Sequence, residues 1–225
     1  MSRSEPGKVI EYKGYNIKVY GDESPESPRD WDCNWGTMVC FHKRYNLGDK
    51  HSYKEVMSFL IDLSSEFIDK DRAERATSEK LFEIISFNCL IFPLYLYSHS
   101  GLSISMKPFS DQWDSGQIGY IYITKKMVRE LLSVKNLTKT IREKVEAALL
   151  SEVAIYDCYL GGYVYGYVID KIDGEEDLYS CWGYYDYDHE KNGLLESARS
   201  YIDYQIGKDQ DEADLEQFIR ECVVQ

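Results

Sequence analysis

The sequence lacks the short motifs that carry many common enzyme chemistries. It contains neither G-x-x-x-x-G-K-[ST] nor G-x-G-x-x-G, so the usual glycine-rich phosphate loops are not expected. No G-x-S-x-G segment marks a nucleophilic serine, and the four histidines form no H-x-x-x-H pair. These absences exclude the enzyme classes that depend on such motifs. We therefore favour a protein that is not an enzyme and that needs no cofactor, and we keep an enzyme as the alternative.

Long apolar runs and paired cysteines are also absent. The most apolar stretch, Leu81–Tyr97, is interrupted by Glu83, Asn88 and Pro93 and is shorter than a membrane span. The N-terminal segment contains no apolar signal region, and the six cysteines form no C-x-x-C pair. We expect a cytoplasmic protein with reduced thiols and no membrane helix.

Basic residues are scarce in the last third of the chain. Residues 151–225 contain 5 Lys and Arg against 18 Asp and Glu, whereas residues 1–150 contain 21 of each. Such a region repels nucleic-acid phosphates and attracts a basic protein surface, although a solubilising acidic tail has the same composition. We predict binding to the basic surface of a nucleic-acid-binding protein or nuclease, without direct contact to nucleic acid or membrane. The predicted contacts are Asp170, Asp173, Glu175, Glu176, Asp177, Asp186, Asp188 and Glu190.

Hydrophobic periodicity predicts a mixture of hairpins and helices. Alternation in residues 9–20 around Lys13-Gly14 predicts a hairpin, and the turn-rich segment 170–177 separates the strands of another. Capping boxes at Ser52 and Thr140 predict helix starts. Because regular strand–helix–strand alternation is missing, we predict an α+β fold with a mainly antiparallel sheet and packed helices. The further predicted strands are 37–42, 90–97, 103–106, 117–124, 163–169 and 178–182, and the helices are 52–69, 81–89, 125–132, 140–160, 194–207 and 211–222.

A length of 225 residues favours one domain, 1–225, with an acidic region at 151–225. An internal similarity suggests an alternative, because Trp31-Asp32 and Trp113-Asp114 each follow a proline and precede a glycine and a strand. The chain would then consist of two pseudo-repeated halves, 1–100 and 101–225. A Trp-Asp pair before a glycine turn is also a common way to begin a strand.

The loop 22–49 is the alternative place for a site. Arg29 and Lys43 would bind an anion there, and Cys40 with His42 would form a nucleophile and base couple, unless Cys40 is simply a core residue. The alternative function is a small metal- or nucleotide-binding protein or enzyme; a third hypothesis treats the loop as an inert clamp. The acidic run 186–190 could hold a divalent cation, although it lacks the glycine and the twelve-residue pattern of a calcium loop. Whether a metal binds is therefore left open. The alternative pocket comprises Arg29, Trp31, Asp32, His42, Asp49, Trp113 and Asp114.

Two local basic spots stand out against the acidic background. One is Lys43-Arg44-Tyr45, and the other is Lys125-Lys126 with Arg129. They do not offset a net charge of −13, but a small anionic ligand would suit them. Twenty tyrosines add surfaces that stack on a base or pack in an interface or core.

The loop 22–49 contains the pattern P-x-x-P-R-x-W-D, followed by G-x-M and by H-x-x-Y-x-L-G-D. With this pattern, and with the segments 108–124, 156–169 and 180–199, the chain resembles an uncharacterised family of hypothetical proteins from bacteriophages and mobile elements. This chain departs from the pattern in having Cys33, Asn34 and Trp35 where two residues are usual. The resemblance implies no particular chemistry, but it implies a host-cell setting. It favours a non-enzymatic acidic inhibitor of host nucleic-acid-handling or defence machinery, anti-restriction or anti-CRISPR-like, with DNA mimicry as its mechanism. The matching residues are Pro25, Pro28, Arg29, Trp31, Asp32, Gly36, Met38, His42, Tyr45, Leu47, Gly48 and Asp49.

Overall fold

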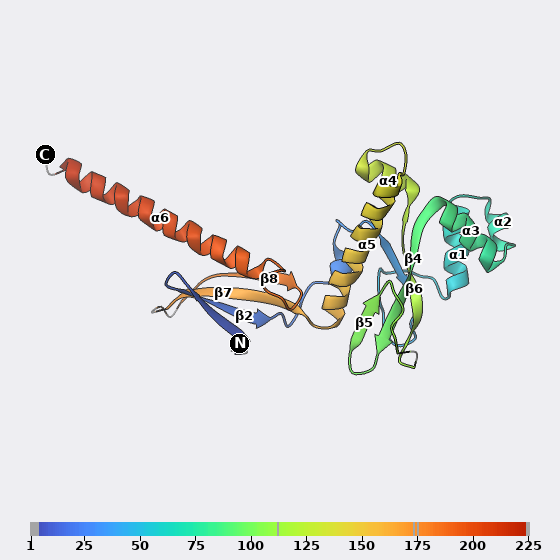
Figure 1. The fold of residues 1–225 in the computed structure, drawn as a ribbon, viewed down its shortest axis with the longest axis horizontal. Coiled ribbons are helices and arrows are strands. Elements are labelled where there is room, and N and C mark those ends of the chain that lie inside the picture. The colour runs from blue at the N-terminus through green and yellow to red at the C-terminus, as the bar shows by residue number, and fades with distance from the viewer. Residues whose placement is uncertain (1–4, 112, 173, 175, 224–225) are drawn as a thin grey trace. The chain divides into compact units, whose positions relative to one another are not determined.

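The computed structural model describes residues 5–111, 113–172, 174 and 176–223, and it confirms the α+β class with antiparallel sheets. The chain divides into two compact units (Figure 1). The inserted unit is Ser27–Gly161, and the split unit combines Met1–Glu26 with Gly162–Gln225. These boundaries differ from the predicted halves 1–100 and 101–225. Both Trp-Asp pairs lie in the inserted unit, so they do not mark one copy in each unit.

The inserted unit contains a four-stranded sheet in the order β3-β6-β4-β5, with every neighbouring pair antiparallel. Alternation along β4 places Leu94 and Leu96 on one face and Cys89 and Ile91 on the other. Both faces are therefore covered, which explains the nearly continuous apolar sequence of this strand. The strands are β3 (Thr37–Cys40), β4 (Cys89–Ser98), β5 (Leu102–Ser105) and β6 (Ser115–Thr124).

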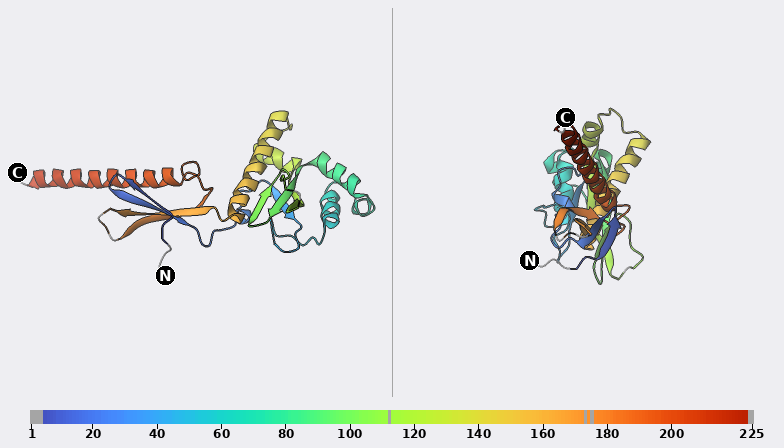
Figure 2. Two further views of the ribbon diagram at one scale, coloured as in Figure 1. Left: turned by 60° about the horizontal axis from the view of Figure 1, so that its bottom comes forward. Right: turned by 90° about the vertical axis from the view of Figure 1, so that its left-hand side faces the viewer.

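Helices cover the two faces of this sheet, as Figure 2 shows from two further directions. On one face, α5 contributes Val145, Leu149 and Val153 to a core shared with the strands, and α4 contributes Val128. On the other face, Phe59 belongs to a second core formed with the first three helices. The helices are η1 (Pro28–Asp30), α1 (Val56–Ser65), α2 (Lys70–Glu74), α3 (Ser78–Asn88), α4 (Lys125–Leu132) and α5 (Lys139–Leu160).

Three predicted helix boundaries in this unit are wrong, because other side chains cap the helices. Glu55, not Ser52, is the N-cap of α1. The segment 70–80, expected as a connector, contains α2 and the start of α3, because Asp69 and Thr77 accept bonds from the first free N–H groups of these helices. At α5, Thr138 is the N-cap and not Thr140.

The split unit is an antiparallel sheet in the order β1-β2-β7-β8 with one helix, α6, on one face. Leu195, Ala198 and Ile202 of α6 pack with Ile17 and Tyr167 of the sheet. Both predicted hairpins of this sheet are confirmed. The elements are β1 (Lys8–Tyr12), β2 (Tyr15–Gly21), β7 (Val164–Lys171), β8 (Asp177–Tyr185) and α6 (Leu194–Val223).

The prediction that the helix ends at Gly207 and restarts at Asp211 is wrong. One helix, α6, continues through both positions. An isolated glycine costs a helix only about 1 kcal/mol relative to alanine, and no proline follows to end it. Ile202 is fully buried, whereas every residue from Gly207 to Glu216 is exposed. The second part of α6 thus leaves the sheet that supports the first part, as Figure 1 shows.

The described cysteines at positions 33, 40, 89, 158 and 181 are not joined in disulfides. No helix within the described ranges combines the length and apolarity that a membrane crossing requires.

Candidate functional site

A buried arginine organises the loop 22–49. Pro28 begins η1, Ser27 caps it, and Arg29 points its side chain inward so that only 4% of it is exposed. The guanidinium binds Asp49 through two bonds, Nε to Oδ1 at 2.7 Å and Nη2 to Oδ2 at 3.0 Å. Nη1 donates to Oε2 of Glu152 on α5 at 3.0 Å. This bidentate geometry suits arginine and not lysine.

The same cluster satisfies backbone groups around it. Arg29 Nη2 donates to the carbonyl of Gly36 at 2.7 Å, and Asp49 Oδ2 accepts from the N–H of Met38 at 2.9 Å. Glu152 Oε1 accepts from the N–H of Trp35 at 2.6 Å. Burial opposes the charge of Arg29, but bonds to the two carboxylates outweigh burial and raise the arginine pKa.

Arg29 and Asp49 therefore have a structural role, which corrects their assignment as ligand-binding groups. Each of their polar groups is engaged within the cluster, which fastens η1 and the loop after β3 onto α5. The hypothesis of a clamp accounts for these two residues. A ligand would have to displace buried, charge-assisted bonds to reach them.

The Leu47-Gly48-Asp49 segment has the same structural character. Leu47 is buried, and Gly48 has a φ of 72°, a conformation that disfavours other residues. A Cβ on Gly48 would lie 2.5 Å from the carbonyl oxygen of Met38. Its N–H donates to the hydroxyl of Tyr156 at 2.9 Å. These residues of the P-x-x-P-R-x-W-D…L-G-D motif thus allow the loop to pack closely against β3 and α5.

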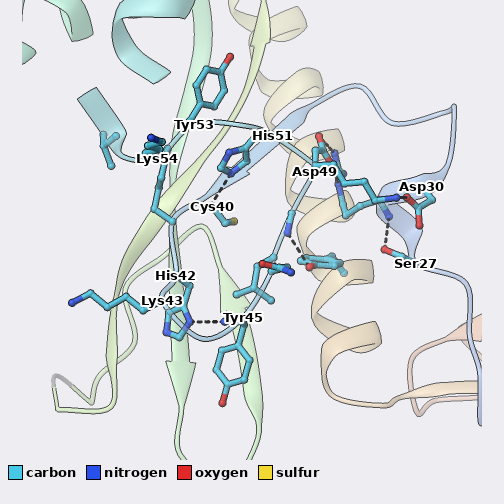
Figure 3. Close-up of a pocket in the computed structure, with 18 of the residues that line it drawn as sticks. Ser27, Asp30, Cys40, His42, Lys43, Tyr45, Asp49, His51, Tyr53 and Lys54 are labelled. Carbon is cyan, nitrogen blue, oxygen red and sulfur yellow. Dashed lines mark hydrogen bonds and ion pairs between the residues drawn. The ribbon is translucent and has the colours of Figure 1, made fainter. Parts of the chain in front are cut away.

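Beside this clamp lies an open cavity of about 1030 Å³ (Figure 3). It is lined mainly by residues 40–56, with Tyr156 and Tyr159 from α5. This volume is slightly above the range of about 300–1,000 Å³ for small-molecule sites. Of the predicted pocket, Arg29, His42 and Asp49 line this cavity, whereas Trp31, Asp32, Trp113 and Asp114 are not among its lining residues.

His42 and Tyr45 form one wall of the cavity. Their rings stack at 4.9 Å with an angle of 12° between planes. His42 Nδ1 accepts from the backbone N–H groups of Arg44 and Tyr45, each at 3.2 Å, and Figure 3 shows the bond to Tyr45. In the neutral ring the proton is therefore on Nε2, which can donate to a ligand.

His51 also lines the cavity. Its Nε2 lies 2.9 Å from the carbonyl oxygen of Cys40, so this nitrogen carries the proton of the neutral ring. Nδ1 is buried and has no hydrogen-bond partner among the described residues. The ring lies 5.3 Å from Phe41 and 5.4 Å from Tyr53. His51 thus contains an unused acceptor in an aromatic setting, but this atom is buried and not exposed to the open cavity.

Of the two interpretations of Cys40, the core residue is confirmed and the catalytic couple with His42 is wrong. Cys40 is 6% exposed and belongs to the core shared with α5. Burial raises its thiol pKa to about 12, so the nucleophilic thiolate is not formed near neutral pH. β3 ends at Cys40, and His42 lies beyond it with Nδ1 bound to backbone N–H groups.

The remaining members of the predicted pocket lie at the surface. Trp31 ends η1, and Asp32 follows in an exposed turn. Trp113 is 97% exposed, and Asp114 pairs with His99 at 2.9 Å. Among the residues with described positions, no group of three or more His, Cys, Asp or Glu side chains could hold a metal ion.

The predicted acidic contacts fall into three groups. Asp170 is 4% exposed, accepts from Asn16 at 2.8 Å and pairs with Lys18, so its assignment as a partner contact is wrong. Glu176 and Asp177 are exposed at the β7–β8 hairpin. Asp173 and Glu175 lie outside the described residues.

The third group is the turn before α6, where basic neighbours already engage the carboxylates. Asp188 pairs with Lys191 at 2.8 Å, and Glu190 forms two bonds of 2.9 Å to Arg199. These bonds lower the pKa of both acids. Asp186 accepts from the N–H of Asp188 at 3.1 Å. This turn is ordered by its own bonds and offers a partner less free charge than its sequence suggests.

The structure instead exposes acids that the sequence interpretation missed. The segment Gly207–Glu216 of α6 contains one lysine, Lys208, and five acids, all exposed. The sequence interpretation expected a helix break at Gly207 and did not consider these acids as one exposed helical surface. The absence of proline and the run of helix-forming and acidic residues could have predicted a continuous helix. These acids are Asp209, Asp211, Glu212, Asp214 and Glu216.

No protein-family model matches this chain, and neither do any curated proteins or solved structures that were compared. The resemblance to phage and mobile-element proteins therefore stays a prediction.

Proposed function

We propose that this protein is a non-enzymatic interaction protein whose split unit binds the basic surface of a nucleic-acid-handling protein. The observation that carries the proposal is the separation of charge between the units. The split unit contains 9 Lys and Arg against 21 Asp and Glu, a net charge of −12, whereas the inserted unit contains 17 against 18, a net charge of −1. Charge of one sign on one unit favours fast association with an oppositely charged partner.

The exposed part of α6 is the proposed centre of the contact. Ten residues of helix extend about 15 Å, at 1.5 Å per residue. Five acids and one lysine leave four net negative charges over that length, or one per about 4 Å, which is close to one per about 3.4 Å along a DNA strand. Asp211 and Asp214, and likewise Glu212 and Glu216, are neighbours on the helix surface. A groove shaped for a phosphate backbone would meet a similar density of charge here.

A basic partner would also relieve a local conflict. Like charges three and four positions apart destabilise a helix, and the exposed residues from Gly207 to Glu216 bury no apolar side chain to compensate. Lysines and arginines of a partner would neutralise this repulsion. We therefore propose that binding increases the stability of the exposed part of α6.

The proposed setting is the host cell of a phage or mobile element, and the proposed partner is a nuclease or other component of its defence machinery. The protein would occupy the DNA-binding groove and act as an anti-restriction or anti-CRISPR-like inhibitor. The support is the motif resemblance together with the charge pattern of α6. Burial of the Cys40 thiol, which raises its pKa, also argues against nucleophilic catalysis by this residue.

The test is competition with DNA. Fluorescence anisotropy would follow the displacement of a labelled duplex from purified restriction and CRISPR nucleases, at about 50 and 200 mM salt, where electrostatic binding differs strongly. The variant combines Asp209→Asn, Asp211→Asn and Asp214→Asn. A matched control removes three exposed carboxylates of the inserted unit through Asp71→Asn, Glu74→Gln and Glu146→Gln.

We expect the α6 variant to lose competition and the control to retain it. Competition should weaken steeply with salt. If the two variants compete equally, or if salt has no effect, the proposal is refuted.

The cavity of Figure 3 supports a second candidate function, binding of a small polar aromatic molecule. The supporting observation is the stacked pair of His42 and Tyr45 in the cavity wall, where His42 Nε2 can donate to a ligand because Nδ1 accepts from the backbone. A thermal-shift titration with adenosine, a polar aromatic molecule without phosphates, would test it, since a ligand that binds only the native state raises the melting temperature. The shift should disappear in His42→Ala and persist in His99→Ala, a histidine outside the cavity.

A further inference from the structure

A second cavity in the inserted unit has a lining in which cations outnumber acids. It measures about 690 Å³ and lies where the end of α3 meets α4 and the start of α5. Four cationic side chains line it, with Glu66 as the only lining acid. The cations are Lys125, Lys126, Arg129 and Arg142.

This concentration of basic residues is local. Residues 125–144 contain seven Lys and Arg against two acids, in a unit whose net charge is −1. A solvated helical segment explains cations that point outward, such as Lys139, which pairs with Glu143 at 3.7 Å. It does not explain four cations that share one cavity, because like charges repel at close range.

Two of the four cations are held in place by backbone carbonyls. Lys125 Nζ donates to the carbonyls of Ser86 at 3.3 Å and of Phe87, at the C-terminal end of α3. Arg129 Nε donates to the carbonyl of Lys135 at 3.2 Å, and Nη1 donates to that of Lys125 at 3.3 Å. These bonds fix cations at the cavity without neutralising them by a carboxylate.

The other two cations are available. Lys126 and Arg142 are exposed, and neither side chain has a salt bridge or hydrogen bond to another described residue. Burial, with the charges of Arg142 and Arg129, lowers the pKa of Lys125, which reports the repulsion within the group. An anion at this position would relieve that repulsion and receive several charge-assisted bonds.

An aromatic ring lies at the same cavity. Phe87 is 78% exposed, and Lys125 Nζ lies 5.4 Å from the centre of its ring. A phenylalanine this exposed gains little from folding, whereas its free face can stack on a nucleobase. The volume of the cavity lies within the usual range for a small ligand.

From this geometry we infer that the cavity binds a nucleotide, with its phosphates held by Arg142 and Lys126 and its base stacked on Phe87. This site is separate from the acidic contact of the split unit. It also differs from the cavity beside His42, since the two share no lining residue. The sequence predicted that a small anionic ligand would suit Lys125, Lys126 and Arg129. In this proposal that ligand is a phosphate ester.

Isothermal titration calorimetry of the full chain tests the inference, with ATP, pyrophosphate and a short oligothymidylate as the probes. The site variant combines Lys126→Gln and Arg142→Gln. The matched control combines Lys139→Gln and Lys144→Gln, which remove the same charge from the same segment at residues that do not line the cavity. These four side chains are exposed, so both variants should fold.

We expect ATP to bind, the site variant to lose about tenfold or more in affinity, and the control to stay within about twofold. Phe87→Ala should weaken the binding of ATP and leave the binding of pyrophosphate unchanged, because only ATP has a base. The inference is overturned if ATP does not bind, or if the site variant and the control lose the same amount of affinity for ATP. It is also overturned if His42→Ala and not the site variant abolishes ATP binding, or if the oligonucleotide binds more tightly than ATP.

Discussion

Replacing Arg29 by methionine should strongly destabilise the inserted unit. The side chain is 4% exposed and faces Asp49 and Glu152, whose side chains are 25% and 13% exposed. The substitution keeps an unbranched side chain but leaves two partly buried carboxylates without their cation. Breaking a buried ion pair by removing one partner costs about 3–5 kcal/mol. We expect a loss near the lower end of that range, because Asp49 keeps some contact with water.

A double-mutant cycle separates the charge effect from packing. Glu152→Gln alone should destabilise the protein, but in the Arg29→Met background it should recover part of the loss, because it removes one unpaired charge. A coupling energy of about 1–3 kcal/mol is expected for groups in direct contact. Lys50→Met serves as the control, since its side chain is 95% exposed and lies 3.6 Å from Asp30. An exposed pair of this kind contributes little.

Urea unfolding monitored by tryptophan fluorescence and circular dichroism measures these differences. Trp35 packs against the core of the inserted unit and reports on it. The clamp interpretation fails if Arg29→Met costs less than about 1 kcal/mol, or if Glu152→Gln gives no recovery in its presence.

Three further predictions concern two glycines and two buried cysteines. Gly207→Ala should stabilise α6 by about 0.5–1 kcal/mol, seen as increased helicity and melting temperature, because a Cβ there meets no atom within 4 Å; a destabilised variant would contradict a continuous helix. Gly119→Ala should prevent stable folding in a urea titration, since its Cβ would lie 2.0 Å from a carbonyl oxygen of β3; wild-type stability would refute this packing. Burial raises the thiol pKa of Cys40 and Cys89 to about 12 from an ordinary 9.0, so unfolding should release protons above pH 9. Stability should then fall between pH 9 and 12 by about 1.4 kcal/mol per pH unit for each thiol, and a Cys40→Ala variant with an unchanged slope would contradict this.

Local signals explain the parts of the fold that were predictable. The hairpin at Lys13-Gly14 needs two residues with positive φ, and the structure has 48° and 85° there. Lys125–Leu132 is a helix over the predicted residues because its signals, an N-cap threonine and an amphipathic pattern, are adjacent in sequence. Such features need no knowledge of distant contacts.

Non-local contacts explain the parts that were missed. Arg29 and Glu152 are 123 positions apart, and no periodicity links them, so Arg29 has the same sequence signature as an anion-binding arginine. Asp170 is a further example, because only the pairing of β2 with β7 places it beside Lys18. At Gly207 a local signal was overestimated. Glycine favours the end of a helix, but α6 continues through this residue.

The insertion between β2 and β7 has a consequence for the order of folding. Gly21 pairs with Tyr165, so 143 residues separate two positions that are neighbours in one sheet. With those residues unfolded, closing this loop costs about 3 kcal/mol more than closing a four-residue hairpin. Once Ser27–Gly161 is folded, that flexible length is gone and the pairing of β2 with β7 becomes nearly local. The central strands of the split unit should therefore form late, and mutations in the inserted unit should slow their pairing.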